Sequence, residues 1–172
     1  MSRVVWFIYV QPLHKIILFS ILLIVAWACI GSRADRKLWW RFFNAAVFLC
    51  VVAVILYVTL YSRKESVRDV ILIPFHSFIE AKEQPELYRS MLMNVFLFVP
   101  LGLSFPYILP DRWGVAAHMV FAVLAGGCLS VVVEAVQYRY GLGRCEVDDV
   151  IMNTLGALLG AQAYMTGNRF AH

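Results

Sequence analysis

The sequence predicts an all-α protein, a polytopic bundle that crosses a membrane about five times and forms a single domain over residues 1–172. The first observation is composition: 62% of the residues are hydrophobic, only 15% are charged, and the mean hydropathy is +0.74. Globular domains are nearer half apolar and a quarter charged. The second observation is that the apolar residues form long runs, and about 20 of them in a helix cross the roughly 30 Å of hydrocarbon.

Cysteine usage and charge exclude several classes. Of the four cysteines, Cys29, Cys50 and Cys128 lie in apolar runs and only Cys145 lies in a link. This spacing fits neither a disulfide framework nor a tetrahedral zinc site, so we expect no metal and no cofactor. The net charge of +4 is small and spread over the links, so we expect no nucleic-acid partner.

The first two spans are expected over about residues 12–31 and 42–61. We interpret the first, an N-terminal extra span, as an uncleaved anchor because its apolar stretch is too long for a signal peptide. The link between the two spans contains Trp39 and Trp40 and four cations, a combination typical of the cytoplasmic interface. These cations are Arg33, Arg36, Lys37 and Arg41.

The long link over residues 62–89 carries five basic and five acidic side chains, which cancel. It also contains the apolar run VILIPFHSFI at 70–79. This run is too short to span, and Pro74 would break a helix there, so an interfacial or re-entrant segment over the helix ends is expected. The alternative is an apolar patch that packs on the bundle without chemistry.

Three further spans are expected over about residues 90–109, 115–138 and 150–164. In the second of these, small residues and a carboxylate recur at steps of four, which places them on one helical face. Glycines on such a face allow a neighbouring backbone to approach closely. The helix-packing positions predicted in this way are Gly126, Gly156 and Gly160.

Polar side chains gather where the last three spans meet. Because consecutive helices alternate in direction, the start of the third span, the end of the fourth and the start of the fifth lie on one side of the membrane. Polar groups at the edge of lipid-compatible helices are costly, which favours a functional site. Its members are Asn94, Glu134, Gln137, Arg144, Asp148, Asp149 and Asn153.

Structural roles for the same side chains stay open. Arg144 would then form an ion pair with Asp148 or Asp149 that pins the link between the last two spans. Asp148 would cap the last helix. In the functional interpretation, Arg144 contacts an anionic group of a ligand, because its planar fork matches phosphate and carboxylate.

The cation-rich first link predicts the orientation. With residues 33–41 in the cytoplasm, the N-terminus lies outside, the C-terminus lies inside, and the polar site faces the cell exterior. A total count of Lys and Arg opposes this assignment, but five of the opposing cations lie in the long link, where five acids balance them.

Four motifs resemble the VanZ family of bacterial membrane proteins. They are LIPF at 72–75, N-x-F-L-F-x-P-L-G at 94–102, E-x-x-Q at 134–137 and GLGRCEVDDVIMNTLGALLG at 141–160. The resemblance covers about residues 70–165 and leaves out the first span. It implies a multi-pass protein of the bacterial cell membrane. Members of the family are associated with resistance to teicoplanin-type glycopeptide antibiotics and have no established molecular activity.

Three classes of function remain open at this point. In the first, the bundle binds an envelope lipid or a lipid-linked cell-wall precursor, or the glycopeptide itself, and reduces the action of the antibiotic. In the second, it is an intramembrane enzyme in which Glu134 and Asp149 supply acid–base chemistry, although no nucleophile with an evident base is present. In the third, it is a small transporter or an assembly partner. All three have the lipid bilayer as a partner.

Overall fold

The computed structural model describes residues 26–27, 38–61, 68–84 and 86–169, and nearly all of this part is helical. The all-α prediction is confirmed. In chain order the elements are the helices and strands α3 (Leu38–Leu56), the π-helical η1 (Tyr57–Tyr61), β1 (Val70–Ile71), α4 (His76–Glu80), α5 (Glu86–Ser104), the 3-10 helix η2 (Phe105–Tyr107), α6 (Val115–Tyr140), β2 (Cys145–Glu146) and α7 (Val147–Arg169).

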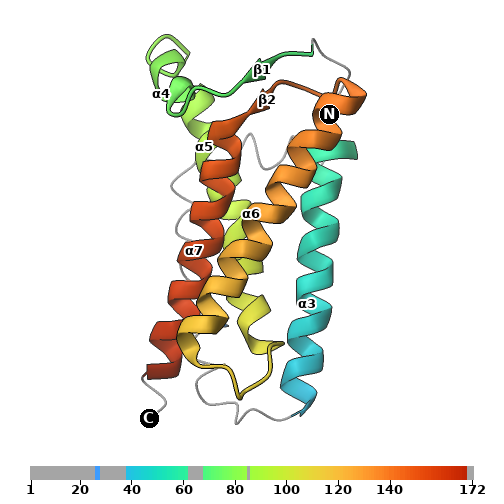
Figure 1. Cartoon of the computed structure of the whole chain (residues 1–172), viewed down its shortest axis with the longest axis vertical. Coiled ribbons are helices and arrows are strands. Elements are labelled where there is room, and N and C mark those ends of the chain that lie inside the picture. The colour runs from blue at the N-terminus through green and yellow to red at the C-terminus, as the bar shows by residue number, and fades with distance from the viewer. Residues whose placement is uncertain (1–25, 28–37, 62–67, 85, 170–172) are drawn as a thin grey trace.

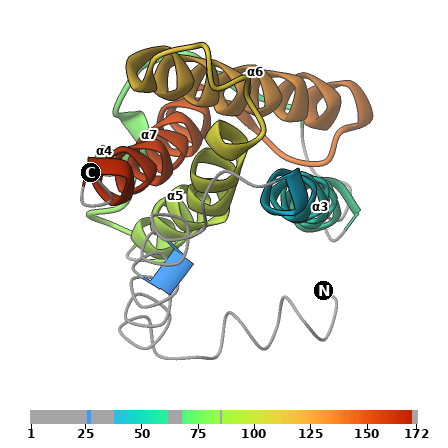
Figure 2. The same ribbon diagram turned by 90° about the horizontal axis from the view of Figure 1, so that it is seen from below.

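The long helices α3, α5, α6 and α7 run side by side along the long axis of the molecule (Figure 1). Helix α7 packs most extensively on α5 and also on α6, while α3 lies at one edge against α5, as the view from below shows (Figure 2). The centre of the bundle is an apolar cluster of Ile55, Phe98, Leu101, Val133 and Ala157, one or more from each long helix. Burial of these side chains holds the four helices together.

Three of the described helices are long and apolar enough to cross a membrane: Leu38–Tyr61, Glu86–Tyr107 and Val115–Tyr140. The expected span at 12–31 lies outside the described residues, apart from residues 26–27. The expected span at 150–164 lies within α7, which is not one of the three. Because α7 packs against α5 and α6, it needs less apolar surface than a helix surrounded by lipid.

Glycines permit the tight packing of α7 on α5. A Cβ atom added to Gly156 would overlap the backbone carbonyl oxygen of Val95, and one added to Gly160 would overlap that of Val99. From the other side, a Cβ on Gly102 would overlap the carbonyl oxygen of Ala157. The helices therefore touch backbone to backbone, as in the small-residue contacts of membrane helices.

The segment over residues 69–80 does not cross the bundle. It lies across the end where α5 and α7 begin, with β1 and α4 on top of the helices (Figure 1). Strand β1 pairs in parallel with β2, with Val70 opposite Cys145 and Ile71 opposite Glu146. The prediction of a short segment over the helix ends is thus confirmed, and we refer to residues 69–80 as the cap segment.

Candidate functional site

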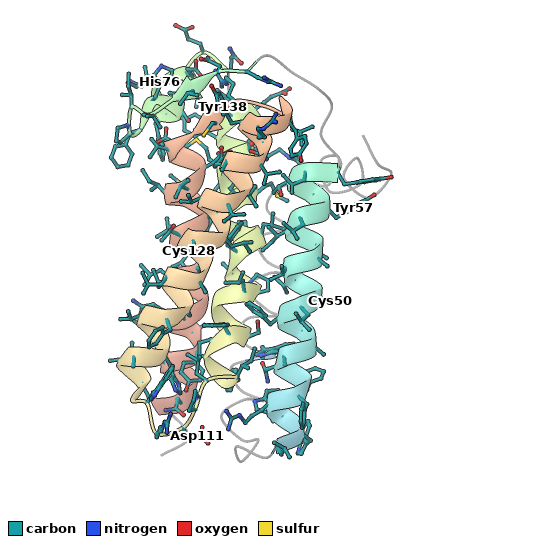
Figure 3. All side chains as sticks on the ribbon, turned by 45° about the vertical axis from the view of Figure 1, so that its right-hand side comes forward. Cys50, Tyr57, His76, Asp111, Cys128 and Tyr138 are labelled. Atoms are coloured by element: carbon teal, nitrogen blue, oxygen red, sulfur yellow. The ribbon has the colours of Figure 1, made fainter. Side chains whose placement is uncertain are left out.

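Four elements meet at the end of the bundle covered by the cap segment: α4, the start of α5, the end of α6 and the start of α7. His76 and Tyr138 mark this end in Figure 3, and Asp111 marks the opposite end. The alternation of helix direction predicted this convergence. The polar side chains do not form one uniform site, however, but divide into three groups and one separate buried pair, each with different contacts.

The first group, which we call the inner cluster, consists of Asn94, Glu134, Cys145 and Asp149. Asn94 Nδ2 donates a hydrogen bond of 2.7 Å to Asp149 Oδ1, which joins α5 to α7. Glu134 is only 4% exposed, and its Oε2 accepts a hydrogen bond of 3.1 Å from the backbone N–H of Glu146. The Asp149 carboxylate thus joins α7 to α5, and the Glu134 carboxylate joins α6 to β2.

One turn deeper, a second polar pair joins α6 to α7. Asn153 Nδ2 donates a hydrogen bond of 2.8 Å to Ser130 Oγ, and both side chains are buried. Asn153 follows Asp149 by four residues and Ser130 precedes Glu134 by four, so the pair lies directly beneath the inner cluster. The Asn153 Oδ1 atom has no hydrogen-bond partner within the described part of the chain.

The second group surrounds Arg144. Its guanidinium donates to both carboxylate oxygens of Glu80, with distances of 3.3 and 3.1 Å, and its Nε lies 2.8 Å from Glu146 Oε1. The hydrogen bond with Glu80, together with the negative charge of Glu146, raises the pKa of Arg144 in spite of its partial burial. Sequence reasoning expected Asp148 or Asp149 as the ionic partner. The observed partners belong to the cap segment and to β2 instead.

Asp148 also contacts the cap segment. The carboxylate is 1% exposed and accepts two short backbone hydrogen bonds, from Phe75 N–H at 2.6 Å and from Ser77 N–H at 2.7 Å. Glu146 Oε2 accepts a further bond of 2.9 Å from the Ser77 hydroxyl. The interpretation of Asp148 as the cap of its own helix is therefore wrong, because its oxygens are aimed at α4 rather than at α7.

We call Arg144, Glu146 and Asp148 the clamp. Together with the parallel pairing of β1 and β2, these side chains hold the cap segment from its beginning to its end. Sequence reasoning missed Ser77 and Glu80 as their partners. The several acidic residues near Arg144 in the sequence indicated that it forms an ion pair, but they could not show which carboxylate contacts its guanidinium.

The third group is Gln137 alone. Its Nε2 donates a hydrogen bond of 2.9 Å to the backbone carbonyl oxygen of Thr59, in the π-helical turn at the end of α3. Gln137 is fully buried, and it fastens α3 to α6 rather than joining the inner cluster. Among the described residues, no three His, Cys, Asp or Glu side chains are grouped so as to hold a metal ion.

Cys145 provides a chemical probe of the inner cluster. Burial raises the pKa of its thiol, and the negative charge of nearby Glu134 and of Asp149 and Glu146 raises it further. A raised pKa keeps the thiol protonated at neutral pH, where it is a poor nucleophile.

We expect iodoacetamide to alkylate Cys145 slowly at pH 8. The alkylation rate should increase with pH and level off only above pH 9.0, the ordinary pKa of a cysteine thiol. In Glu134→Gln one source of negative charge is lost, so the pKa falls and alkylation at pH 8 becomes faster. The measurement uses a chain in which the other three cysteines are serine, with Glu83→Gln as the exposed control. If Glu134→Gln and its parent are alkylated at the same rate, the charge of Glu134 does not raise the pKa of the Cys145 thiol, and the prediction is contradicted.

Fold and site together define a class: a membrane protein whose apolar helical bundle carries a buried polar network at one end, under a short interfacial segment. The chain belongs to the VanZ/LLP1 family, whose model matches residues 43–168. This match confirms the resemblance seen in the motifs and extends it beyond residues 70–165 to include most of α3.

A curated relative is Protein VanZ of Enterococcus faecium, which is 30% identical over 82 residues, or 48% of this chain and 48% of that protein. The chain thus spans about half the length of this relative. No solved structure matches the chain.

Proposed function

We propose that this protein, as a multi-pass protein of a bacterial membrane, binds the head group of an envelope lipid or lipid-linked cell-wall precursor at its inner cluster. By doing so it reduces the action of teicoplanin-type glycopeptides. The observation that carries the proposal is the position of the Glu134 and Asp149 carboxylates, which lie at the end of the bundle directly below an apolar segment.

An amphiphilic ligand fits this combination. The cap segment exposes the apolar side chains of Leu72, Ile73, Phe75 and Ile79, and a patch of this kind marks a membrane or ligand contact. The inner cluster offers carboxylate oxygens, each of which can accept more than one hydrogen bond. Sugar hydroxyl and amide N–H groups of a cell-wall precursor are donors of this type, and its lipid chain would lie along the apolar patch.

The clamp changes the role proposed for Arg144. Its guanidinium holds two carboxylates, Glu80 and Glu146, and thereby fixes the cap segment above the inner cluster. Arg144 therefore positions the segment, and head-group recognition depends on Asn94, Glu134 and Asp149. Substitution of Arg144 by lysine keeps the charge but loses the planar fork that spans two partners.

The proposal predicts that Glu134→Gln and Asp149→Asn each lose a charge-assisted hydrogen bond to the ligand, which corresponds to about a tenfold or larger loss of affinity. Lipid that co-purifies with the protein, measured by mass spectrometry, should fall accordingly. Survival of a sensitive host under teicoplanin should return to that of cells without the protein. Membrane abundance is measured in parallel, and the exposed Glu83→Gln and Glu86→Gln serve as controls.

Two outcomes would contradict binding at the inner cluster. One is full protection by a Glu134→Gln or Asp149→Asn protein that accumulates normally. The other is loss of protection with an unchanged inventory of bound lipid, because that result assigns Glu134 or Asp149 to a chemical step and favours the enzyme alternative.

A further inference from the structure

The cap segment has an apolar side that is exposed. Within residues 70–79, His76 is the one side chain that can carry a charge. The exposed apolar side chains, which we call the outer face, are Leu72, Ile73, Phe75, Phe78 and Ile79. A contiguous apolar surface of this kind marks a contact with a membrane or with another molecule, so the outer face needs an occupant.

The polar groups of the cap segment are directed at the bundle. The backbone N–H groups of Phe75 and Ser77 donate to Asp148, and the Ser77 hydroxyl donates to Glu146. The segment is therefore amphipathic, with hydrogen bonds to the protein on one side and apolar side chains on the other. Amphipathic elements lie in the plane of a membrane surface, with the apolar side sunk into the boundary between head groups and acyl chains.

The outer face continues the exposed apolar surface of α5, one of the helices long and apolar enough to cross a membrane. The Phe75 ring lies 6.0 Å from that of Phe78, and the Phe78 ring lies 6.5 Å from that of Tyr88, near the start of α5. Tyr88 and Leu92, one helical turn apart, are both exposed. An apolar surface thus runs without a break from the side of a candidate span onto the cap segment, which lies beside it (Figure 1).

Exposed tyrosines mark the level of the membrane surface at this end of the bundle. Tyr61 ends η1, Tyr88 lies near the start of α5, and Tyr138 and Tyr140 lie at the end of α6. Figure 3 shows Tyr138 at the same end as His76 of the cap segment. Tyrosine is enriched where hydrocarbon meets water, because its ring is apolar and its hydroxyl is polar. The cap segment therefore lies at the level of the head groups.

The backbone of Phe75 indicates that its ring has a partner outside the protein. Its φ of 63° lies in the left-handed region, which favours glycine and strains any larger residue. Phe75 is nevertheless 57% exposed, so its ring gains little from burial against the protein. Contact with lipid accounts for a phenylalanine at this strained position, because it removes the exposed part of the ring from water.

We propose that the outer face of the cap segment is a membrane-docking surface, buried among the phospholipids of the leaflet at this end of the bundle. The occupant is the bilayer itself, whose upper acyl carbons contact Leu72, Ile73, Phe75 and Ile79. The inner cluster beneath the segment then lies below the level of the head groups. This inference does not depend on the function proposed for the inner cluster, since bilayer lipid covers the outer face whether or not a ligand is bound.

The test measures the depth of nitroxide labels in the full chain, reconstituted in vesicles of phosphatidylcholine and phosphatidylglycerol. All four cysteines are replaced by serine, and separate proteins carry Leu72→Cys, Phe75→Cys or Ile79→Cys, three exposed positions outside the core. Power-saturation paramagnetic resonance compares collisions with oxygen, which dissolves in lipid, and with a water-soluble nickel chelate. We expect oxygen to collide more often at all three positions, at a depth of about 5–10 Å into the boundary between head groups and acyl chains.

Two further labels calibrate the measurement. Leu92→Cys, on the exposed side of α5, should show the same excess of oxygen collisions as a label in lipid. Glu83→Cys, on the exposed link before α5, should show the reverse, with more nickel collisions. Glu134→Gln, combined with Phe75→Cys, should leave the depth of the label unchanged, because the outer face contacts the bilayer independently of the inner cluster.

Three results would overturn the proposal. More nickel than oxygen collisions at residues 72, 75 and 79 would place the outer face in water. Few collisions with either would show that protein covers it, from a second copy or another part of this chain. A loss of depth at residue 75 on addition of Glu134→Gln would assign the face to the chain of a bound ligand. An unchanged depth in Glu134→Gln supports docking even if that variant keeps its co-purified lipid and the proposed function fails. Three label positions keep the test decisive if one variant does not accumulate.

Discussion

Substitution of Gly160 by leucine is expected to prevent assembly of the bundle. A Cβ atom at this position would overlap the carbonyl oxygen of Val99 and would lie 2.6 Å from the amide nitrogen of Leu103. Both are backbone atoms of α5, which cannot rotate away as a flexible side chain does. To admit the new side chain, α5 and α7 must separate, and that separation exposes the core around Phe98 and Leu101.

The cost should reach or exceed the upper end of the range for overpacked cores, about 3 kcal/mol. Gly160→Leu should therefore be scarce in the membrane or elute as an aggregate, as measured by size-exclusion chromatography of a fluorescent fusion. Gly114→Leu is the control, because no atom lies within 4 Å of a Cβ there and the backbone φ of −64° is ordinary. A Gly160→Leu protein with the elution volume and melting temperature of the parent would contradict the packing described for α5 and α7.

The sequence predicted the convergence of polar groups because it follows from chain direction alone. Asn94 lies eight residues after the start of α5, Glu134 six residues before the end of α6 and Asp149 two residues after the start of α7. Because consecutive helices alternate in direction, all three lie towards the same end of the bundle. The observed hydrogen bond between Asn94 and Asp149 is a consequence of that arrangement. Spacing of four residues also placed Asn153 below Asp149 correctly, since the helical period fixes it.

The partners of the clamp could not be predicted in the same way. Arg144 has several acids near it in sequence, and local spacing does not favour Glu80, which is 64 residues away, over Asp148. The choice depends on where the cap segment folds back, and this is set by the pairing of β1 with β2. Strands of two residues have no periodicity that a sequence could reveal.

One of the expected spans, at 150–164, is not among the three candidate spans of the described residues. Helix α7 carries Asp148, Asp149 and Asn153 near its start, and its composition is too polar for it to be one of the three candidate spans. It is nevertheless long and packs against α5 and α6. Hydropathy detects the contact of a helix with lipid, and therefore gives a weak signal for a helix that is covered by its neighbours.

Loss of the Asp148 carboxylate is expected to release the cap segment while the helical bundle stays assembled. Asp148→Ala removes the acceptor of both the Phe75 and Ser77 N–H groups, which lie 2.6 and 2.7 Å from its oxygens. Hydrogen bonds to a charged group contribute about 1.5–3 kcal/mol each, so local opening should become easier by at least about 3 kcal/mol. Amide exchange over residues 72–79 should then accelerate by roughly a hundredfold or more.

The backbone of Phe75 makes this dependence stronger. Its φ of 63° is in the left-handed region, which costs a residue other than glycine about 1–2 kcal/mol. In the parent, Asp148 holds this turn in place; in Asp148→Ala, the strain favours opening. The double variant Asp148→Ala, Phe75→Gly should therefore exchange more slowly over residues 72–79 than Asp148→Ala alone, because glycine adopts the turn without strain.

The control is Glu83→Ala, which removes an exposed carboxylate on the link before α5 and should leave amide exchange unchanged. Protection of residues 72–79 in Asp148→Ala equal to that of the parent would show that strand pairing and Arg144 hold the segment without this carboxylate. Loss of the whole bundle in Asp148→Ala would instead make the clamp part of the core, contrary to the separation between the cap segment and the packed helices described above.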